Sequence, residues 1–243
     1  MIPFQPKAVA ALAARTLRSA AGTPSVVAAL LVFYLITGLL FSLPLFLEGQ
    51  ASIRGLLDVA PLLLALLAPA LTMGLLAEEL RTGTFETLAT SPLEDWDIVL
   101  GKYLGFSALL GLLVAGLLYF PISVSVLSAP PGLDWGAACC TLLALLLQGL
   151  LFGAIGLFAS SLTRSQAAAF LVAFSLCFAL LACGRSAPML PGALSSLARY
   201  ASVEGHMDAL ARGVLDTRDL VYFATGVFAF LFLAVQRLEA RRL

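Results

Sequence analysis

The sequence predicts an all-α, polytopic membrane protein with six transmembrane helices, an N-terminal interfacial elbow helix and short extracytoplasmic helices before the last span. Apolar residues make up 61% of the 243 residues and charged residues only 12%, whereas a soluble domain averages roughly 25% charged residues. The apolar residues gather in runs long enough to cross a bilayer. These runs lack the alternation of barrel strands, so helices are the expected way to satisfy their backbone hydrogen bonds in lipid.

Six runs are expected to span the membrane. Each holds at least the roughly 17 residues that a transmembrane helix needs, except the last, which is marginal at 16 residues. The runs cover residues 26–47, 56–77, 99–127, 136–161, 167–183 and 220–235. We therefore expect residues 1–243 to form a single transmembrane domain.

The basic residues predict the orientation of the chain, because cytoplasmic loops are enriched in Lys and Arg. With a cytoplasmic N-terminus, nine of the 14 basic residues fall inside and five outside, and four of those five lie in one long loop, residues 184–219. Long loops follow the rule poorly. We expect a multi-pass protein of the inner (plasma) membrane with both termini in the cytoplasm.

An amphipathic helix is expected over residues 5–20, ahead of the first span. At 100° per residue its apolar side and its basic side are opposite. The apolar side holds Val9, Leu12, Ala13 and Thr16, and the basic side holds Lys7, Arg15 and Arg18. This pattern is typical of an elbow helix on the inner leaflet; the alternative is a basic flank that only fixes topology.

The loop at 184–219 is expected to contain two short helices at the outer leaflet. One apolar set runs from Leu194 to Ala201 and another from Met207 to Ala211, with Pro and Gly residues around them. Asp216, followed by Asp219 three residues later, resembles a cap for the sixth span.

The sequence offers no site for catalysis, a cofactor or a metal. A phosphate-binding loop around Gly101 and Lys102 would need Gly at position 96 and Ser or Thr at 103, where the chain has Trp96 and Tyr103. His206 is the only histidine, and the four cysteines lack zinc or disulfide spacing. The balanced charge does not suggest a nucleic-acid partner. An ATP-driven process would therefore need a separate ATPase.

Few ionisable residues lie within the expected spans, so a proton- or ion-coupled carrier would lack the buried charges that it usually uses. Gln148 is interpreted as an interhelical hydrogen-bonding residue, with substrate contact as the alternative. The small residues Gly149, Gly153 and Gly156 would let another helix approach closely, either in this chain or in a second copy. Pro69 interrupts the second span as a structural bend or a hinge. Together these residues form a hypothetical hinge or dimer seam.

The link between the second and third spans is the most informative segment. It is acidic, and Gly83 is expected to end the second helix. A short helix with Phe85 and Leu88 on one side would follow, and Ser91 and Pro92 would restart a helix with Glu94 at its third position. Such a protrusion suits docking into another protein's groove; the alternative is a solvated acidic loop.

Charged residues beside this link suggest a network at the membrane face. Its expected members are Glu78, Glu79, Arg81 and Lys102. The alternative is ordinary surface pairing, which contributes little to stability.

The chain resembles the membrane subunits of the ABC-2 family of ABC exporters, most closely the permeases of gliding motility and of nitrous-oxide reductase maturation. The first set of resembling residues is Pro69, Leu71-Thr72-Met73, Ala77-Glu78-Glu79, Gly83-Thr84, Glu86, Leu88, Thr90-Ser91-Pro92 and Val99-Leu100-Gly101-Lys102. A second set runs from Ile155 to Gln166, and a third from Ala211 to Asp216 and on to Tyr222. The chain departs at Leu80-Arg81, where the family commonly has two basic residues.

The resemblance implies that residues 84–90 form a coupling helix gripped by a nucleotide-binding subunit that holds ATP and Mg. The implied docking residues are Gly83, Thr84, Phe85, Glu86, Leu88, Thr90, Ser91 and Pro92. It also implies a second permease, either a copy or a sister chain, within the lipid bilayer, and leaves room for an extracytoplasmic accessory protein. The alternative function is an ATP-independent secondary carrier or membrane scaffold.

Overall fold

The computed structural model describes residues 5–48, 55–84, 94–128, 133–189 and 191–242. Within these ranges the chain is helical and contains no strand. The α-helices are α1 (Pro6–Gly22), α2 (Pro24–Glu48), α3 (Gly55–Thr72), α4 (Gly74–Thr82), α6 (Asp95–Gly116), α7 (Tyr119–Leu127), α8 (Trp135–Leu162), α9 (Gln166–Ser186), α10 (Ala193–Ala201), α11 (Val203–Ala211) and α12 (Thr217–Arg242). A short 3-10 helix, η1 (Ala187–Met189), follows α9.

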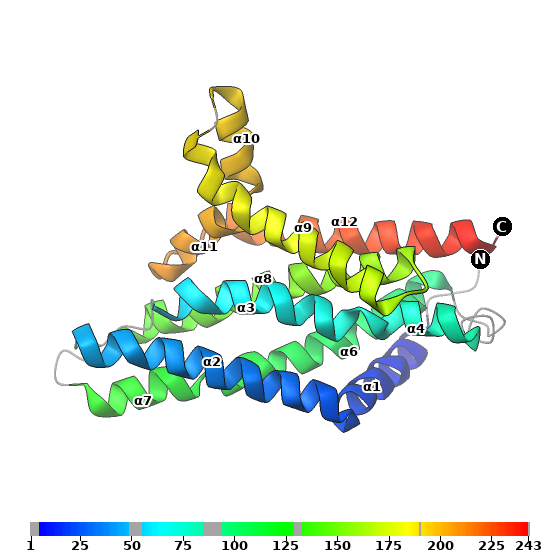
Figure 1. The fold of residues 1–243 in the computed structure, drawn as a ribbon, viewed down its shortest axis with the longest axis horizontal. Coiled ribbons are helices and arrows are strands. Elements are labelled where there is room, and N and C mark those ends of the chain that lie inside the picture. Colours follow the sequence, from blue (N-terminus) through cyan, green and yellow to red (C-terminus); the bar gives the residue numbers. More distant parts are fainter. Residues whose placement is uncertain (1–4, 49–54, 85–93, 129–132, 190, 243) are drawn as a thin grey trace.

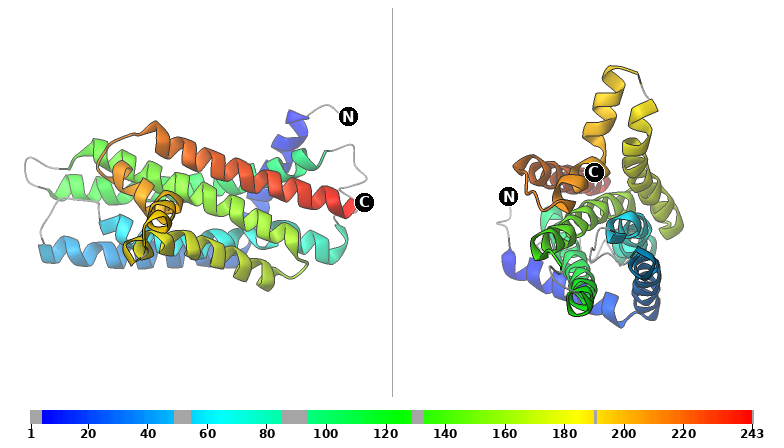
Figure 2. Two further views of the ribbon diagram at one scale, coloured as in Figure 1. Left: turned by 90° about the horizontal axis from the view of Figure 1, so that it is seen from above. Right: turned by 90° about the vertical axis from the view of Figure 1, so that its left-hand side faces the viewer.

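Six stretches of the described chain are long and apolar enough to cross a membrane, which confirms the predicted number. They are Pro24–Ser42, Gly55–Thr82, Asp95–Leu127, Trp135–Leu162, Gln166–Ser186 and Thr217–Arg241. The long helices lie side by side in one bundle (Figures 1 and 2). Helices α1 and α4 and the C-terminal part of α12 lie at one end, called here the α4 end, and α7 and α11 lie toward the other (Figure 1).

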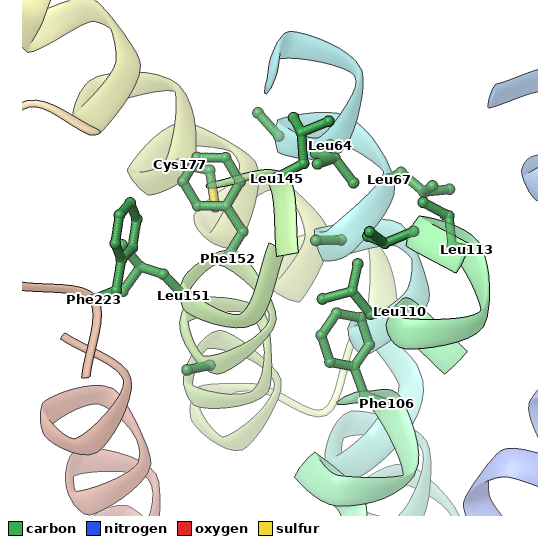
Figure 3. Packing of buried hydrophobic residues seen from close by; sticks show 14 of the residues in the cluster. Leu64, Leu67, Phe106, Leu110, Leu113, Leu145, Leu151, Phe152, Cys177 and Phe223 are labelled. Carbon is green, nitrogen blue, oxygen red and sulfur yellow. The ribbon is translucent and has the colours of Figure 1, made fainter. Parts of the chain in front are cut away.

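Helix α8 forms the centre of the bundle. It packs against α3, α6, α9, α11 and α12. Its Phe152 is fully buried, and Leu151 contributes to the same core as Phe223 of α12. Figure 3 shows Phe106 and Leu110 of α6 in this cluster of buried side chains. An apolar helix that is buried on most sides belongs in the middle of a membrane bundle, whereas the outer helices carry the lipid-facing residues.

Helix α1 packs directly on α6. The predicted helix is present, and its apolar side fits against two glycines of α6. A Cβ atom at Gly101 would lie 2.8 Å from Leu12 Cδ2, and one at Gly105 would lie 2.8 Å from the Ala13 carbonyl oxygen. Val9 is buried as well. The apolar side of α1 is therefore used for packing within the chain; its position on the inner leaflet stays a prediction.

The third span, expected over residues 99–127, covers Asp95–Leu127 and consists of two helices, α6 and α7. It breaks at residues 117 and 118, between α6 and α7. Tyr34 of α2 donates a hydrogen bond to the Leu113 carbonyl at 2.6 Å, and its ring occupies the space that a side chain at Gly116 would need. Pro121 has no N–H to donate to the Leu117 carbonyl. These side chains weaken the helix at this turn.

The two short helices expected between the fifth and sixth spans are present as α10 and α11. Helix α10 projects away from the bundle (Figures 1 and 2). The last span begins earlier than expected, because α12 starts at Thr217. Asp216 caps it as predicted, since its Oδ1 accepts a hydrogen bond from the Arg218 N–H at 2.9 Å. Asp219 instead pairs with His206 Nδ1 at 2.7 Å.

Candidate functional site

The candidate site is the pair of helix ends that flank the acidic link. Helix α4 ends at Gly83, as predicted, and Gly83 has the left-handed φ of 75° that glycine adopts without strain. Thr84 follows and is exposed. The expected docking residues Phe85, Glu86, Leu88, Thr90, Ser91 and Pro92 lie outside the described residues.

The restart of the chain after the link differs from the prediction. Glu94 was expected at the third position of a helix capped by Ser91, but Glu94 is itself the N-cap of α6, with extended backbone angles. Its side chain accepts a hydrogen bond from the third helical residue, Asp97, and the Asp97 side chain accepts one from the Glu94 N–H at 3.3 Å. A carboxylate can satisfy the first N–H groups of a helix as well as a serine does.

The second span is interrupted at Met73, between α3 and α4; the bend or hinge expected at Pro69 stays a prediction. Pro69 lies within α3, and α4 starts anew at Gly74. Ser160 of α8 stabilises the break: its Oγ accepts hydrogen bonds from the N–H groups of Leu76 at 3.0 Å and Ala77 at 2.9 Å and donates one to the Met73 carbonyl at 2.8 Å. The break thus has its backbone groups paired, as a membrane interior requires.

Sequence reasoning did not single out Ser160 as a site residue. A hydroxyl in an apolar run signals only that some hydrogen bond can form. Its two N–H partners are set by the distant break in α3–α4, which sequence position alone does not reveal.

Lys102 joins the helices on both sides of the link. Its Nζ lies 2.7 Å from Glu79 Oε1 and donates to the Leu75 carbonyl at 2.6 Å. Only 5% of the Lys102 side chain and 25% of the Glu79 side chain are exposed. A buried lysine needs such partners because an unpaired charge in an apolar environment is costly. The pair fixes α4 against α6.

Glu78 makes a second, more exposed set of contacts. Its Oε2 accepts hydrogen bonds from Arg81 Nε at 3.1 Å and from Gln166 Nε2 at 2.6 Å. Gln166 begins α9, so this contact joins α4 to the turn between α8 and α9. The four residues of the predicted charge network thus form two pairs, Glu78–Arg81 within α4 and Glu79–Lys102 between α4 and α6.

The remaining predicted residues lie deeper in the bundle. Gln148 is fully buried and donates from Nε2 to the Pro61 carbonyl at 3.0 Å, which agrees with an interhelical hydrogen bond. The close neighbours of the three glycines all belong to this chain: Leu110 lies against Gly149, Phe106 against Gly153, and Thr72 with Pro69 against Gly156. Within this chain the glycine face is thus filled by α3 and α6, and the role of these residues as a hinge or dimer seam stays a prediction.

Helix α12 also reaches the α4 end. Arg241 Nη2 donates to the Leu162 carbonyl at the end of α8 at 2.9 Å. Trp96 of α6 stacks on Phe228 of α12, with ring centroids 6.2 Å apart. The first turn of α6, next to the acidic link, is thus packed on the last span.

The α4 end offers anchoring contacts between helices. In the part of the chain that the structure describes, no three His, Cys, Asp or Glu residues are grouped closely enough to hold a metal ion. What the arrangement can do is hold both ends of the acidic link on three connected helices, α4, α6 and α8. Force applied to these ends would reach the centre of the bundle.

Comparison with known proteins assigns the chain to a family. A sequence profile of the family described as ABC-2 family transporter protein matches residues 45–198. A comparison with curated proteins found no match. Because the profile covers more than half of the sequence, including α3 to α9 and both sides of the acidic link, this chain belongs to the ABC-2 family of transporter proteins, as a membrane permease component of an ABC transporter.

Proposed function

We propose that this permease exports cargo or remodels the envelope when a separate nucleotide-binding subunit docks on residues 84–90 and hydrolyses ATP. The ion pair between Lys102 and Glu79 carries the proposal, because it ties together the helices on either side of the docking segment. A docked subunit can move the permease only through those helices. Their buried connection makes the two ends of the segment move as one body.

Two further connections would pass the movement on. Ser160 fastens the start of α4 to α8, and α6 carries α1 on its glycine face. Packed helices tend to shift as rigid bodies between discrete arrangements. Closure of the ATPase subunits on each other would therefore tilt α4 and α6 and repack α8. In this proposal Met73 is the hinge of the second span.

The proposed complex contains two permease chains, identical or sister, and two nucleotide-binding subunits that supply ATP and Mg. Its docking side faces the cytoplasm, together with both termini, in the inner membrane. The basic residues support this orientation. Residues such as Gly83-Thr84 and Ser91-Pro92 support the closer resemblance to the gliding-motility and nitrous-oxide-reductase-maturation permeases. An extracytoplasmic accessory protein would meet the α10–α11 region.

The proposal is tested by purifying the affinity-tagged chain from its own host and measuring ATP hydrolysis by the complex. Wild type should co-purify with a nucleotide-binding subunit and hydrolyse ATP. Phe85→Asp should lose that subunit because a charge in an apolar contact is costly. The amount of the Phe85→Asp permease in the membrane should stay unchanged. Glu239→Gln, an exposed change near the end of α12, is the matched control.

Two results would overturn the proposal. One is a Phe85→Asp chain that still brings down the ATPase subunit in normal amounts. The other is a reconstituted chain that transports cargo on an ion gradient without any ATPase, which would favour the secondary carrier.

A further inference from the structure

A cavity lies on the side of the bundle away from the α4 end. It has a volume of about 300 Å³ and is bounded by the start of α3, the last turns of α9 and the start of α11. A second cavity, of about 230 Å³, adjoins it and shares Asp58, Pro61, Arg185 and Glu204. We call the two together the α3–α9 cavity. Ligand pockets usually measure about 300–1,000 Å³, so this one suits a slender ligand.

One half of the α3–α9 cavity is apolar. Leu62 of α3 and Phe178 of α9 are half exposed at its wall, and Leu181 is buried behind them. Leu62 and Phe178 belong to membrane-spanning stretches, so their exposed faces meet the hydrocarbon of the bilayer. A hydrocarbon chain could enter this half sideways from the lipid.

The other half carries charge of predominantly one sign. Asp58, Glu204 and Asp208 line the cavity, and Arg185 is the sole basic residue of its lining among the described residues. Arg185 Nε already donates to Glu204 Oε1 at 3.0 Å. The carboxylates of Asp58 and Asp208 form no hydrogen bond or ion pair with any residue that the structure describes. Asp58 and Asp208 are exposed, so among the described residues the polar half carries an excess of negative charge at solvent-accessible positions.

The backbone adds a further acceptor. Pro61 has no N–H, so the carbonyl of Leu57 lacks the helical donor that it would normally meet four residues on. Leu57 and Pro61 both line the cavity. The carbonyl of Pro61 itself is occupied by Gln148 at 3.0 Å. The carbonyl of Leu57 and the carboxylates of Asp58 and Asp208 are thus acceptors that a hydrogen-bond-donating ligand can use.

We propose that the α3–α9 cavity binds a single-chain amphiphile with a protonated amine: the ammonium group at Asp58 and the hydrocarbon chain along Leu62 and Phe178. An ammonium group carries three donors and the complementary charge. Its position at the ends of two spans places the ligand's polar group at the membrane boundary. As a cargo site the cavity rests on the proposed function; binding itself does not require an ATPase.

The test is equilibrium binding of tritiated dodecylammonium to the full-length chain in phosphatidylcholine nanodiscs, with binding to empty nanodiscs subtracted. Binding should saturate and should be displaced by unlabelled dodecylammonium, but not by dodecanol or dodecanoate. Asp58→Asn should weaken it about threefold or more, because it removes an exposed negative charge that attracts the ammonium group. Phe178→Ala should also weaken it, whereas Glu239→Gln should not.

Three results would overturn the proposal. The first is displacement by dodecanol as strong as displacement by the amine, and the second is unchanged binding in Asp58→Asn. The third is displacement by phosphatidylethanolamine in the nanodisc, which would mean that the cavity takes a two-chain lipid. Phe85→Asp separates this proposal from the proposed function. That variant should keep full amine binding although it loses the ATPase, so each proposal can fail without the other.

Discussion

Lys102 of α6 and Glu79 of α4 form an ion pair across the two helices that flank the acidic link, with 2.7 Å between Nζ and Oε1. Lys102 also donates to the Leu75 carbonyl, so its charge is satisfied although its side chain is almost fully buried. Such a lysine depends on its partners far more than a surface lysine does. The pair therefore connects the helices on both sides of the acidic link energetically as well as geometrically.

Glu79→Gln should destabilise the chain strongly, because it leaves the Lys102 charge buried without a counter-ion. Loss of one partner of a buried pair costs about 3–5 kcal/mol. Glu78→Gln is the matched control: it removes a neighbouring carboxylate whose partner Arg81 is exposed, and its effect should be small. Thermal unfolding in a nonionic detergent measures both. Equal shifts in Tm for the two variants would contradict the special role of Glu79.

Ser160→Ala should loosen the break at Met73. It leaves two buried N–H groups, those of Leu76 and Ala77, without an acceptor, at a cost of about 1–3 kcal/mol for each. Ser161→Ala is the neighbouring control, since Ser161 donates only to the Phe158 carbonyl of its own helix. Amide hydrogen exchange should rise over residues 74–82 in the first variant and stay at the wild-type rate in the second. Unchanged exchange in both would mean that Ser160 does not hold the break.

Hydropathy was enough to predict the six spans, because lipid leaves few alternatives to a helix of about 20 residues. The apolar side of α1 and the cap at Asp216 were also visible, since both depend on residues within a few positions of each other. Local rules of this kind do not need the neighbours to be known. They also located the end of α4 at Gly83.

Several features that the sequence did not reveal depend on distant residues. The break at Met73 depends on Ser160, which supplies the hydrogen bonds there. The break between α6 and α7 depends on Tyr34, which lies 79 residues before Leu113. The glycines of α8 predicted the close approach of another helix. Only the packing identifies α6 and α3 of the same chain as the neighbours.

Gly153→Ala should disturb the contact between α8 and α6, because the added Cβ would overlap the Phe106 ring. Overpacking of this kind typically costs about 1–3 kcal/mol. Gly111→Ala is the control, since nothing lies within 4 Å of a Cβ at that position. Thermal unfolding should show a lower Tm for the first variant alone. A wild-type Tm for Gly153→Ala would show that the contact between α8 and α6 adjusts to the added methyl group without loss of stability.

His206→Phe should loosen α10 and α11 from the last span while keeping a ring against Tyr222, on which His206 stacks with centroids 4.1 Å apart. The variant loses the bonds from Nδ1 to Asp219 and from Nε2 to the Tyr200 carbonyl. Hydrogen exchange should rise over residues 193–211 and not over residues 95–116. Arg199→Gln, an exposed change on α10, should alter neither. A rise shared by both segments would mean general destabilisation instead.

Photo-cross-linking from position 85 in whole cells tests the central claim most directly. A photoreactive amino acid at Phe85 should form an adduct with a nucleotide-binding subunit, identified by mass spectrometry. The same group at Leu112, an exposed apolar position of α6, should not. An adduct at position 85 with an extracytoplasmic protein, or none with an ATPase in cells that contain the assembled transporter, would contradict docking on this segment.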